Sequence, residues 1–104
     1  MTLAISSVSL EYVRVQVTAL KSGSSVNPTG DVVQMAFTGV GVLPVSGDWK
    51  TASWETTPQN AYYAKCLVGS GGAVTLAAGR YDIWVKVTDS PEVPVKLAGQ
   101  LLVT

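Results

Sequence analysis

The sequence predicts an all-β protein, an antiparallel β-sandwich of seven or eight strands that forms one domain over residues 1–104. Three observations support this prediction. The chain is rich in valine and threonine, which favour strands. Several stretches alternate between apolar and polar residues, and none has the sustained apolar period of a helix. Clusters of Gly, Pro, Asn and Asp separate these stretches at intervals of about 8–12 residues, a spacing typical of sandwiches.

The first third of the chain contains one clear strand. Residues 1–8 alternate weakly and are expected to form an N-terminal arm or a short strand. Residues 10–20 alternate regularly and place Val13 and Val15 on the face that we expect to be buried. The polar residues 21–31 include several turn-forming residues and are predicted to form a loop.

The middle of the chain is predicted to form two further strands around an interruption. Residues 32–38 form the first of them. The glycines and proline within residues 39–45 then interrupt the ladder, which indicates an edge segment or a wide loop. Residues 49–55 form a short strand, in which Trp49 and Trp54 are five positions apart and therefore face opposite sides.

The second half of the chain is predicted to be mostly strand. Residues 61–68 carry Tyr63 on one face and Cys66 on the other, and a flexible hairpin loop of residues 69–72 follows. Gly99, in the closing strand, allows a bulge. The remaining predicted strands are residues 73–76, 81–88 and 93–103. The apolar positions that alternate along the closing strand are Val95, Leu97, Gly99, Leu101 and Val103.

The most regular strand, residues 81–88, begins at a recognisable motif. Ile83 and Val85 fall on its apolar face, together with Tyr81 and Val87. The spacing Leu76-x-x-Gly79-x-Tyr81 looks like the tyrosine corner of immunoglobulin-like sandwiches, in which a tyrosine near the start of a strand bonds to backbone upstream. The predicted fold class is therefore an immunoglobulin-like antiparallel β-sandwich with a tyrosine corner. Unlike antibody domains, the chain has a single cysteine and no cysteine pair.

The composition indicates a protein that works within an assembly. Hydrophobic residues make up 47% of the chain, charged residues 13%, and the mean hydropathy is +0.32. The usual charged fraction is about 25%. We expect the surplus apolar surface to meet copies of the chain or another partner, the alternative being a small protein whose surface consists of Thr, Ser and Gly. The formal net charge is zero, with no basic patch, which argues against nucleic-acid binding.

The sequence also lacks the usual signals for membranes and export. No apolar run is long enough for a membrane-spanning helix. The N-terminus has no positively charged segment followed by an apolar one, as a signal peptide would have. We therefore expect no membrane association and no Sec export.

No catalytic, cofactor-binding or metal-binding residues are predicted. The chain has no histidine, which excludes Ser-His-Asp and Cys-His catalysis and most zinc sites. Cys66 lies within a strand and is expected to be a small buried residue. The acidic residues lie mostly in turns and form no calcium-binding motif. The glycines of residues 69–72 precede no helix and so indicate a hairpin loop rather than a phosphate site.

Aromatic residues are the candidate interaction site. The candidate interface residues are Trp84, Trp49, Trp54 and Tyr63. Trp84 stands out because it lies between Asp82 and Lys86 on the polar face of the most regular strand. Its side chain could pack under a loop, contribute to a protein interface, where tryptophan and tyrosine are enriched, or form part of a carbohydrate-binding platform.

These stretches together resemble small structural proteins of tailed bacteriophages and prophages of actinobacteria. The strand order and the corner are similar to the immunoglobulin-like N-terminal module of phage baseplate upper proteins. The stretches that carry the resemblance are residues 12–19, 27–29, 33–37, 47–49, 53–55, 63–69 and 79–95.

The resemblance implies a non-enzymatic virion protein assembled in the host cytoplasm. Its implied role is capsid decoration, a minor capsid protein or a head–tail connector component, with other virion proteins and further copies of itself as partners. The alternative is a tail or baseplate accessory, or a carbohydrate-binding module that attaches to the host surface through exposed aromatics. Residues 3–7 and 100–104 are candidates for pairing strands between neighbouring subunits.

Overall fold

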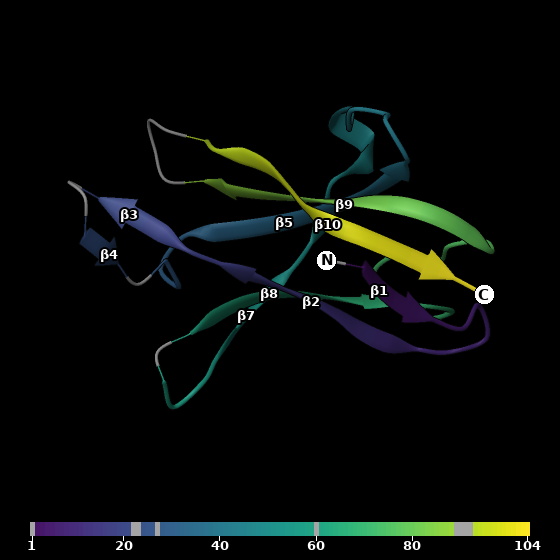
Figure 1. Ribbon diagram of the computed structural model, residues 1–104, viewed down its shortest axis with the longest axis horizontal. Helices are drawn as coiled ribbons and strands as arrows, with labels where there is room; N and C mark the ends of the chain where they lie inside the picture. Colours follow the sequence, from purple (N-terminus) through teal and green to yellow (C-terminus); the bar gives the residue numbers. More distant parts are fainter. Residues whose placement is uncertain (1, 22–23, 27, 60, 89–92) are drawn as a thin grey trace.

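The computed structural model describes residues 2–21, 24–26, 28–59, 61–88 and 93–104, and it is all-β with two stacked sheets (Figure 1). Sheet A has five strands in the order β1 (Thr2–Ile5), β10 (Val95–Val103), β9 (Gly79–Thr88), β5 (Val32–Gly39) and β6 (Lys50–Thr51). Sheet B has three strands in the order β2 (Glu11–Val17), β8 (Tyr62–Val68) and β7 (Ser53–Thr56). A two-stranded ribbon, β3 (Ala19–Lys21) and β4 (Ser24–Val26), and one 3-10 turn, η1 (Ser46–Asp48), complete the described part of the chain.

The core lies between the two sheets and confirms the predicted alternation for residues 11–17 and 81–88, whereas the strand predicted over residues 10–20 ends at Val17. Met35 of sheet A is fully buried, and Val13 and Val15 of sheet B are almost completely buried. Each apolar side chain of this kind adds about 1.5–3 kcal/mol when it is fully removed from water. The buried cluster comprises Val13, Val15, Val33, Met35, Ala64, Cys66, Val68, Ile83, Val85, Leu101 and Val103.

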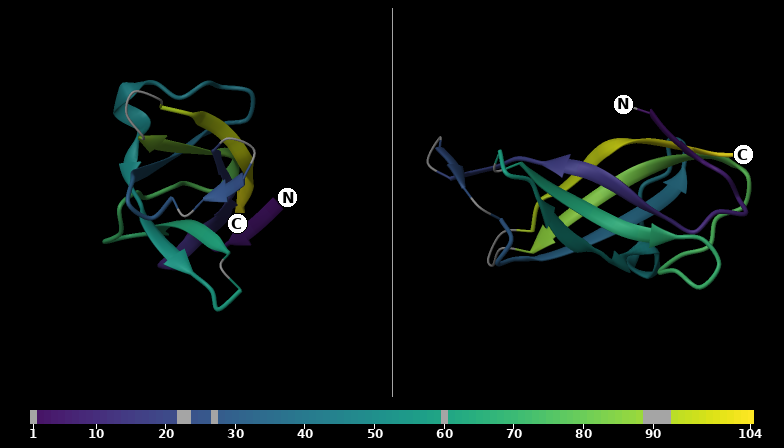
Figure 2. Two further views of the ribbon diagram at one scale, coloured as in Figure 1. Left: turned by 90° about the vertical axis from the view of Figure 1, so that its left-hand side faces the viewer. Right: turned by 90° about the horizontal axis from the view of Figure 1, so that it is seen from below.

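The predicted loop at residues 21–31 contains a strand that the sequence reading missed. β2 ends at Val17, and β3 pairs with β4 in a separate antiparallel ribbon. The ribbon projects beyond the sandwich (Figure 2). The composition of β4, two serines and a valine, has no alternation that could separate it from the surrounding turn residues.

The predicted strand at residues 73–76 is wrong, because this segment makes only one isolated bridge, between Val68 and Val74. The chain instead folds tightly back against the end of β8, where Gly69 N donates to Val74 O at 2.9 Å and Ala73 N donates to Leu67 O at 2.8 Å. Gly69 has a φ of +135°, and a Cβ at this position would lie 2.2 Å from Ser9 O. Only glycine fits this turn without displacing the neighbouring backbone.

The predicted single strand at residues 49–55 is also wrong. Lys50 pairs with Met35 in sheet A, whereas Ser53 pairs with Lys65 in sheet B. The chain changes sheets at Ala52, whose N–H still donates to Val33 O at 3.2 Å. Trp49 and Trp54 therefore do not lie in one strand, and the prediction that they face opposite sides of it is wrong.

A bulge in β10 divides the apolar positions of the closing strand between two faces. Leu97 pairs with Trp84 and Gly99 pairs with Ile83, so Ala98 is an extra residue in β10. Leu101 is fully buried, whereas Leu97 is 55% exposed. The expectation that these alternating residues share one face is wrong, because the extra residue reverses the direction of every side chain before it.

The two ends of the chain pair with each other. β1 lies parallel to β10, with Leu3 opposite Leu101 and Ile5 opposite Val103. Ser7 N extends the contact by donating to Thr104 O at 2.7 Å. Sheet A is therefore not purely antiparallel. Residues 100–104 are not free to pair with a neighbouring subunit as expected, because β10 already has β9 on one side and β1 on the other.

The bulge can be tested with two leucines of the same strand. Leu101→Ala should lower the free energy of unfolding by about 2–5 kcal/mol, because it leaves a cavity in the core. Leu97→Ala, its matched control, should cost less than about 1 kcal/mol, because Leu97 points away from the core. Urea unfolding followed by tryptophan fluorescence measures both values. Equal losses would show that the two leucines share a face and that the bulge is absent.

Candidate interaction surfaces

The structure does not bring the four candidate residues into one site. Trp84 lies on the outer face of sheet A, since its neighbours Ile83 and Val85 point into the core. Trp49 lies on the same face, because its ring packs 4.5 Å below the Nζ atom of Lys86. Trp54 packs against the core, and Tyr63 lies in sheet B.

Trp84 and Trp49 are half-buried and have structural roles. Trp84 Nε1 donates to Thr38 Oγ1 at 3.0 Å, and Trp84 is paired with Ala36 across the sheet. Ala36 is fully buried although it lies outside the core cluster. Trp49 precedes Lys50, the residue that pairs with Met35, and so comes level with Ala36. The centre of the outer face of sheet A is therefore covered rather than open to solvent.

The cover is the connection between β5 and β6, residues 40–49, which a polar network holds in place. Asp82 is 5% exposed; its Oδ2 accepts from Gly41 N at 2.9 Å and its Oδ1 from Gln100 Nε2 at 3.4 Å. Thr38 Oγ1 donates to Val42 O at 2.7 Å. Figures 1 and 2 show η1 and its flanking loop on the side of sheet A that faces away from sheet B. Because the carboxylate is almost fully buried, its two hydrogen bonds are strongly favoured.

A group of exposed aliphatic side chains occupies the same side of the molecule. Val95 and Leu97 pair with Lys86 and Trp84, so they share the outer face of sheet A. Four more lie in the connection that covers this face. We call this group the outer patch; each of its residues is between 45% and 71% exposed: Val40, Val42, Leu43, Val45, Val95 and Leu97.

The outer patch was not predicted from the sequence. Residues 39–45 were predicted to be an edge segment or a wide loop, and Val95 and Leu97 were grouped with Leu101 and Val103 as alternating positions of one strand. The one available signal was composition, because an aliphatic run between glycines and a proline is unusual for a solvent-exposed loop.

Trp54 and Cys66 are integrated into the interior. Trp54 Nε1 donates to Asp31 O at 2.9 Å, which ties β7 to the start of β5. Cys66 is 1% exposed, as expected, and its Sγ lies 3.7 Å from Thr51 O. Burial raises the pKa of the Cys66 thiol, while the charge of Lys50 partly opposes the shift. The thiol therefore stays protonated near neutral pH.

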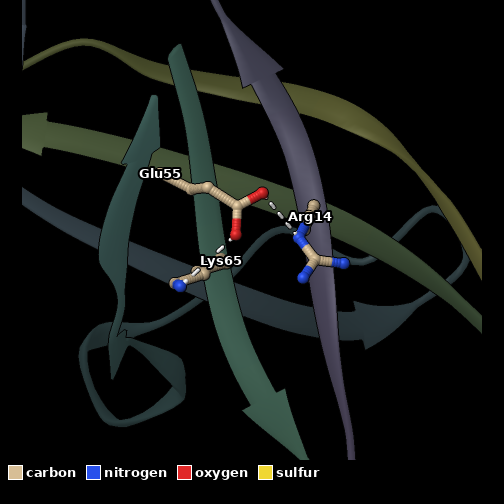
Figure 3. A network of polar contacts seen from close by, with 3 residues as sticks. All are labelled: Arg14, Glu55 and Lys65. Atoms are coloured by element: carbon tan, nitrogen blue, oxygen red, sulfur yellow. Dashed lines mark hydrogen bonds and ion pairs between the residues drawn. The ribbon is translucent and has the colours of Figure 1, made fainter. Parts of the chain in front are cut away.

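The outer face of sheet B carries charges of both signs (Figure 3). Glu55 accepts from Arg14 Nε at 2.9 Å and from Lys65 Nζ at 3.4 Å. Lys65 Nζ also lies 4.6 Å above the ring of Tyr12. Tyr63 is paired with Glu55, beside this group. Desolvation raises the pKa of the Glu55 carboxyl, but the hydrogen bonds and charges of Arg14 and Lys65 outweigh it, so its pKa lies below the ordinary value.

Neither surface has the chemistry of a metal site. In the part of the chain that the structure describes, no three residues among Asp, Glu, Cys and His gather into a group that could hold an ion. The same residues include no helix long and apolar enough to cross a membrane.

No protein-family model, curated protein or solved structure matches this chain. The geometry of the two outer faces, together with the composition, is therefore the basis for a functional proposal.

The role of Asp82 can be tested by Asp82→Ala. We expect a loss of about 1–3 kcal/mol in the free energy of unfolding, because the charge-assisted hydrogen bond from Gly41 N to the buried Asp82 carboxylate is lost. Hydrogen exchange at the Gly41 amide should also accelerate. Asp48→Ala is the control, since Asp48 accepts from Val45 N at an exposed position, and it should cost less. Equal losses in the two variants would contradict an anchoring role for Asp82.

The charge group on sheet B should make stability depend on pH. Because the folded pKa of Glu55 is lowered, its contribution is complete above the unfolded pKa, about 4.3, and is lost as the pH falls through the folded value. The stability difference between the wild type and Glu55→Gln should therefore shrink on acidification. Glu11→Gln, which removes an exposed carboxylate at the start of β2, is the control. Urea unfolding across an acid pH series measures both, and a difference that stays constant with pH would contradict the prediction.

Proposed function

We propose that this protein is a non-enzymatic structural component of a bacteriophage virion, built as an immunoglobulin-like sandwich. The strand order supports the fold assignment. β10, β9 and β5 follow the order G-F-C of immunoglobulin domains, and β2, β8 and β7 follow B-E-D. Tyr81, near the start of β9, donates its hydroxyl to Ala77 O at 2.7 Å, as a tyrosine corner would require.

The outer patch is the observation that carries the functional proposal. The six aliphatic side chains of the outer patch are exposed, on a chain in which only 13% of residues are charged. Monomeric soluble proteins rarely keep extended apolar patches unless they bind something. Hydrogen bonds from Gly41 to Asp82 and from Thr38 to Val42 fix the connection that carries most of the patch. A surface fixed in this way loses little conformational entropy on binding.

The virion assignment combines this surface with the family resemblance. Small phage structural proteins act by docking, and a rigid sandwich with one apolar outer face suits that role. We favour capsid decoration, a minor capsid protein or a head–tail connector over a tail or baseplate accessory. The carbohydrate-binding alternative is weaker, because Trp84 and Trp54 already use their indole N–H groups within the chain.

The proposal is tested by mass spectrometry of purified phage particles produced by the host that carries this gene. The chain should appear at a fixed ratio to the major capsid protein, and separated heads should retain it. An abundant host cytoplasmic protein in the same preparation serves as the control for contamination. If the chain is expressed in the infected cell but absent from particles, the virion role is wrong.

A further inference from the structure

We propose that the outer patch is a self-complementary contact, through which a second copy of this chain packs face to face against the outer side of sheet A. The inference rests on the proposed assembly role and names the partner. It follows from the bulge in β10, the anchored connection, and the charge and extent of the surface.

The bulge is the first step. Without the extra residue Ala98, the side chains of Val95 and Leu97 would point into the core with Leu101. With it, both point outward and remain about half exposed. Bulges re-aim side chains at functional edges, and this one moves two aliphatic residues from the interior to the surface.

The anchored connection is the second step. Gly41 has a φ of +82°, which favours glycine, and its N–H bonds to the buried Asp82. Thr38 holds the next residue through Val42 O. Both hydrogen bonds join backbone atoms of the connection to side chains of sheet A. The side chains of Val40, Val42 and Leu43 are exposed to solvent.

Trp84 lies between the two parts of the outer patch, the residues of β10 and those of the connection. It pairs with Leu97 on one side and bonds through Nε1 to Thr38, under the connection, on the other. Six exposed aliphatic residues and two half-buried indoles, those of Trp84 and Trp49, therefore line one surface.

The chemistry of the surface favours a second copy as the partner. A two-fold contact brings the same patch to both sides, so any unbalanced charge would meet its own sign. Three nearby charged groups are engaged within the chain: Asp82 is buried, Asp48 accepts from Val45 N, and Lys86 lies over Trp49. Arg80, at the start of β9 on the same face, is exposed. Contacts between identical subunits are also more apolar than non-obligate contacts. The outer patch consists of Val and Leu alone.

Sedimentation velocity over a micromolar concentration series tests the inference. The wild type should reach a dimer, and Val45→Asp and Leu97→Asp should each weaken the dimer by about tenfold or more, because each buries a carboxylate without a partner. Val8→Asp is the matched control. Val8 is 93% exposed and lies between β1 and β2, so this change should leave the dimer unaffected. Far-UV circular dichroism and melting temperatures establish that each variant is folded.

The outcomes separate this inference from the proposed function. A wild type that stays monomeric, or folded patch variants that dimerise as well as the wild type, would overturn the second-copy contact. If a monomeric chain is still present in particles and the patch variants are lost from them, the patch binds another virion protein. A patch-dependent dimer that is absent from particles supports the contact and overturns only the virion role.

Discussion

Strand β9 is covered on both faces, and this constraint fixes the rest of the sheet. Ile83 is fully buried between the sheets, while its neighbour Asp82 is 5% exposed on the opposite face. A slip of one residue would place the carboxylate in the core and the isoleucine among the polar atoms of the connection. The pairing of β5 and β10 with β9 therefore has only one favourable register, and the order of sheet A follows from it.

The buried carboxylate connects stability with the properties of the surface. Removing Asp82 from water is costly, and the N–H of Gly41 and the amide of Gln100 offset that cost. The same bonds determine how the connection runs over the sheet, and hence which aliphatic side chains face outward. The hydrogen bonds of Asp82 that stabilise the fold therefore also place the side chains of the outer patch on the surface.

The apolar–polar alternation of the sequence predicted those features of the fold that depend on a single strand, namely which side chains point inward. The inward faces of residues 10–20 and 81–88 were predictable, because alternate side chains of a strand point to opposite faces whatever its neighbours are. The parallel pairing of β1 with β10 was not, because it joins the two ends of the chain. The change of sheets at Ala52 also depends on partner strands and separates Trp49 from Trp54. The bulge beside Gly99 was predicted as a possibility from that glycine, but its effect on Val95 and Leu97 was not.

The candidate site was predicted less well than the fold, for a related reason. Trp54 was chosen as an outward aromatic but lies against the core, where its indole N–H reaches Asp31 O. The aliphatic residues of the connection were overlooked, because a loop has no period that separates buried from exposed positions. Trp84 and Trp49 cover Ala36 on the outer face of sheet A. The exposed surface beside them consists of valines and leucines, residue types that are usually buried.

The outer faces of the two sheets differ in chemistry. Sheet B presents Arg14, Glu55 and Lys65, whose opposite charges are paired and remain compatible with water. Sheet A presents an aliphatic surface on a connection that is bonded to the buried Asp82. A contact through sheet A leaves sheet B, the edge of β7 and the projecting β3–β4 ribbon accessible. A pair of chains joined in this way would display two copies of each remaining surface and could bind partners multivalently.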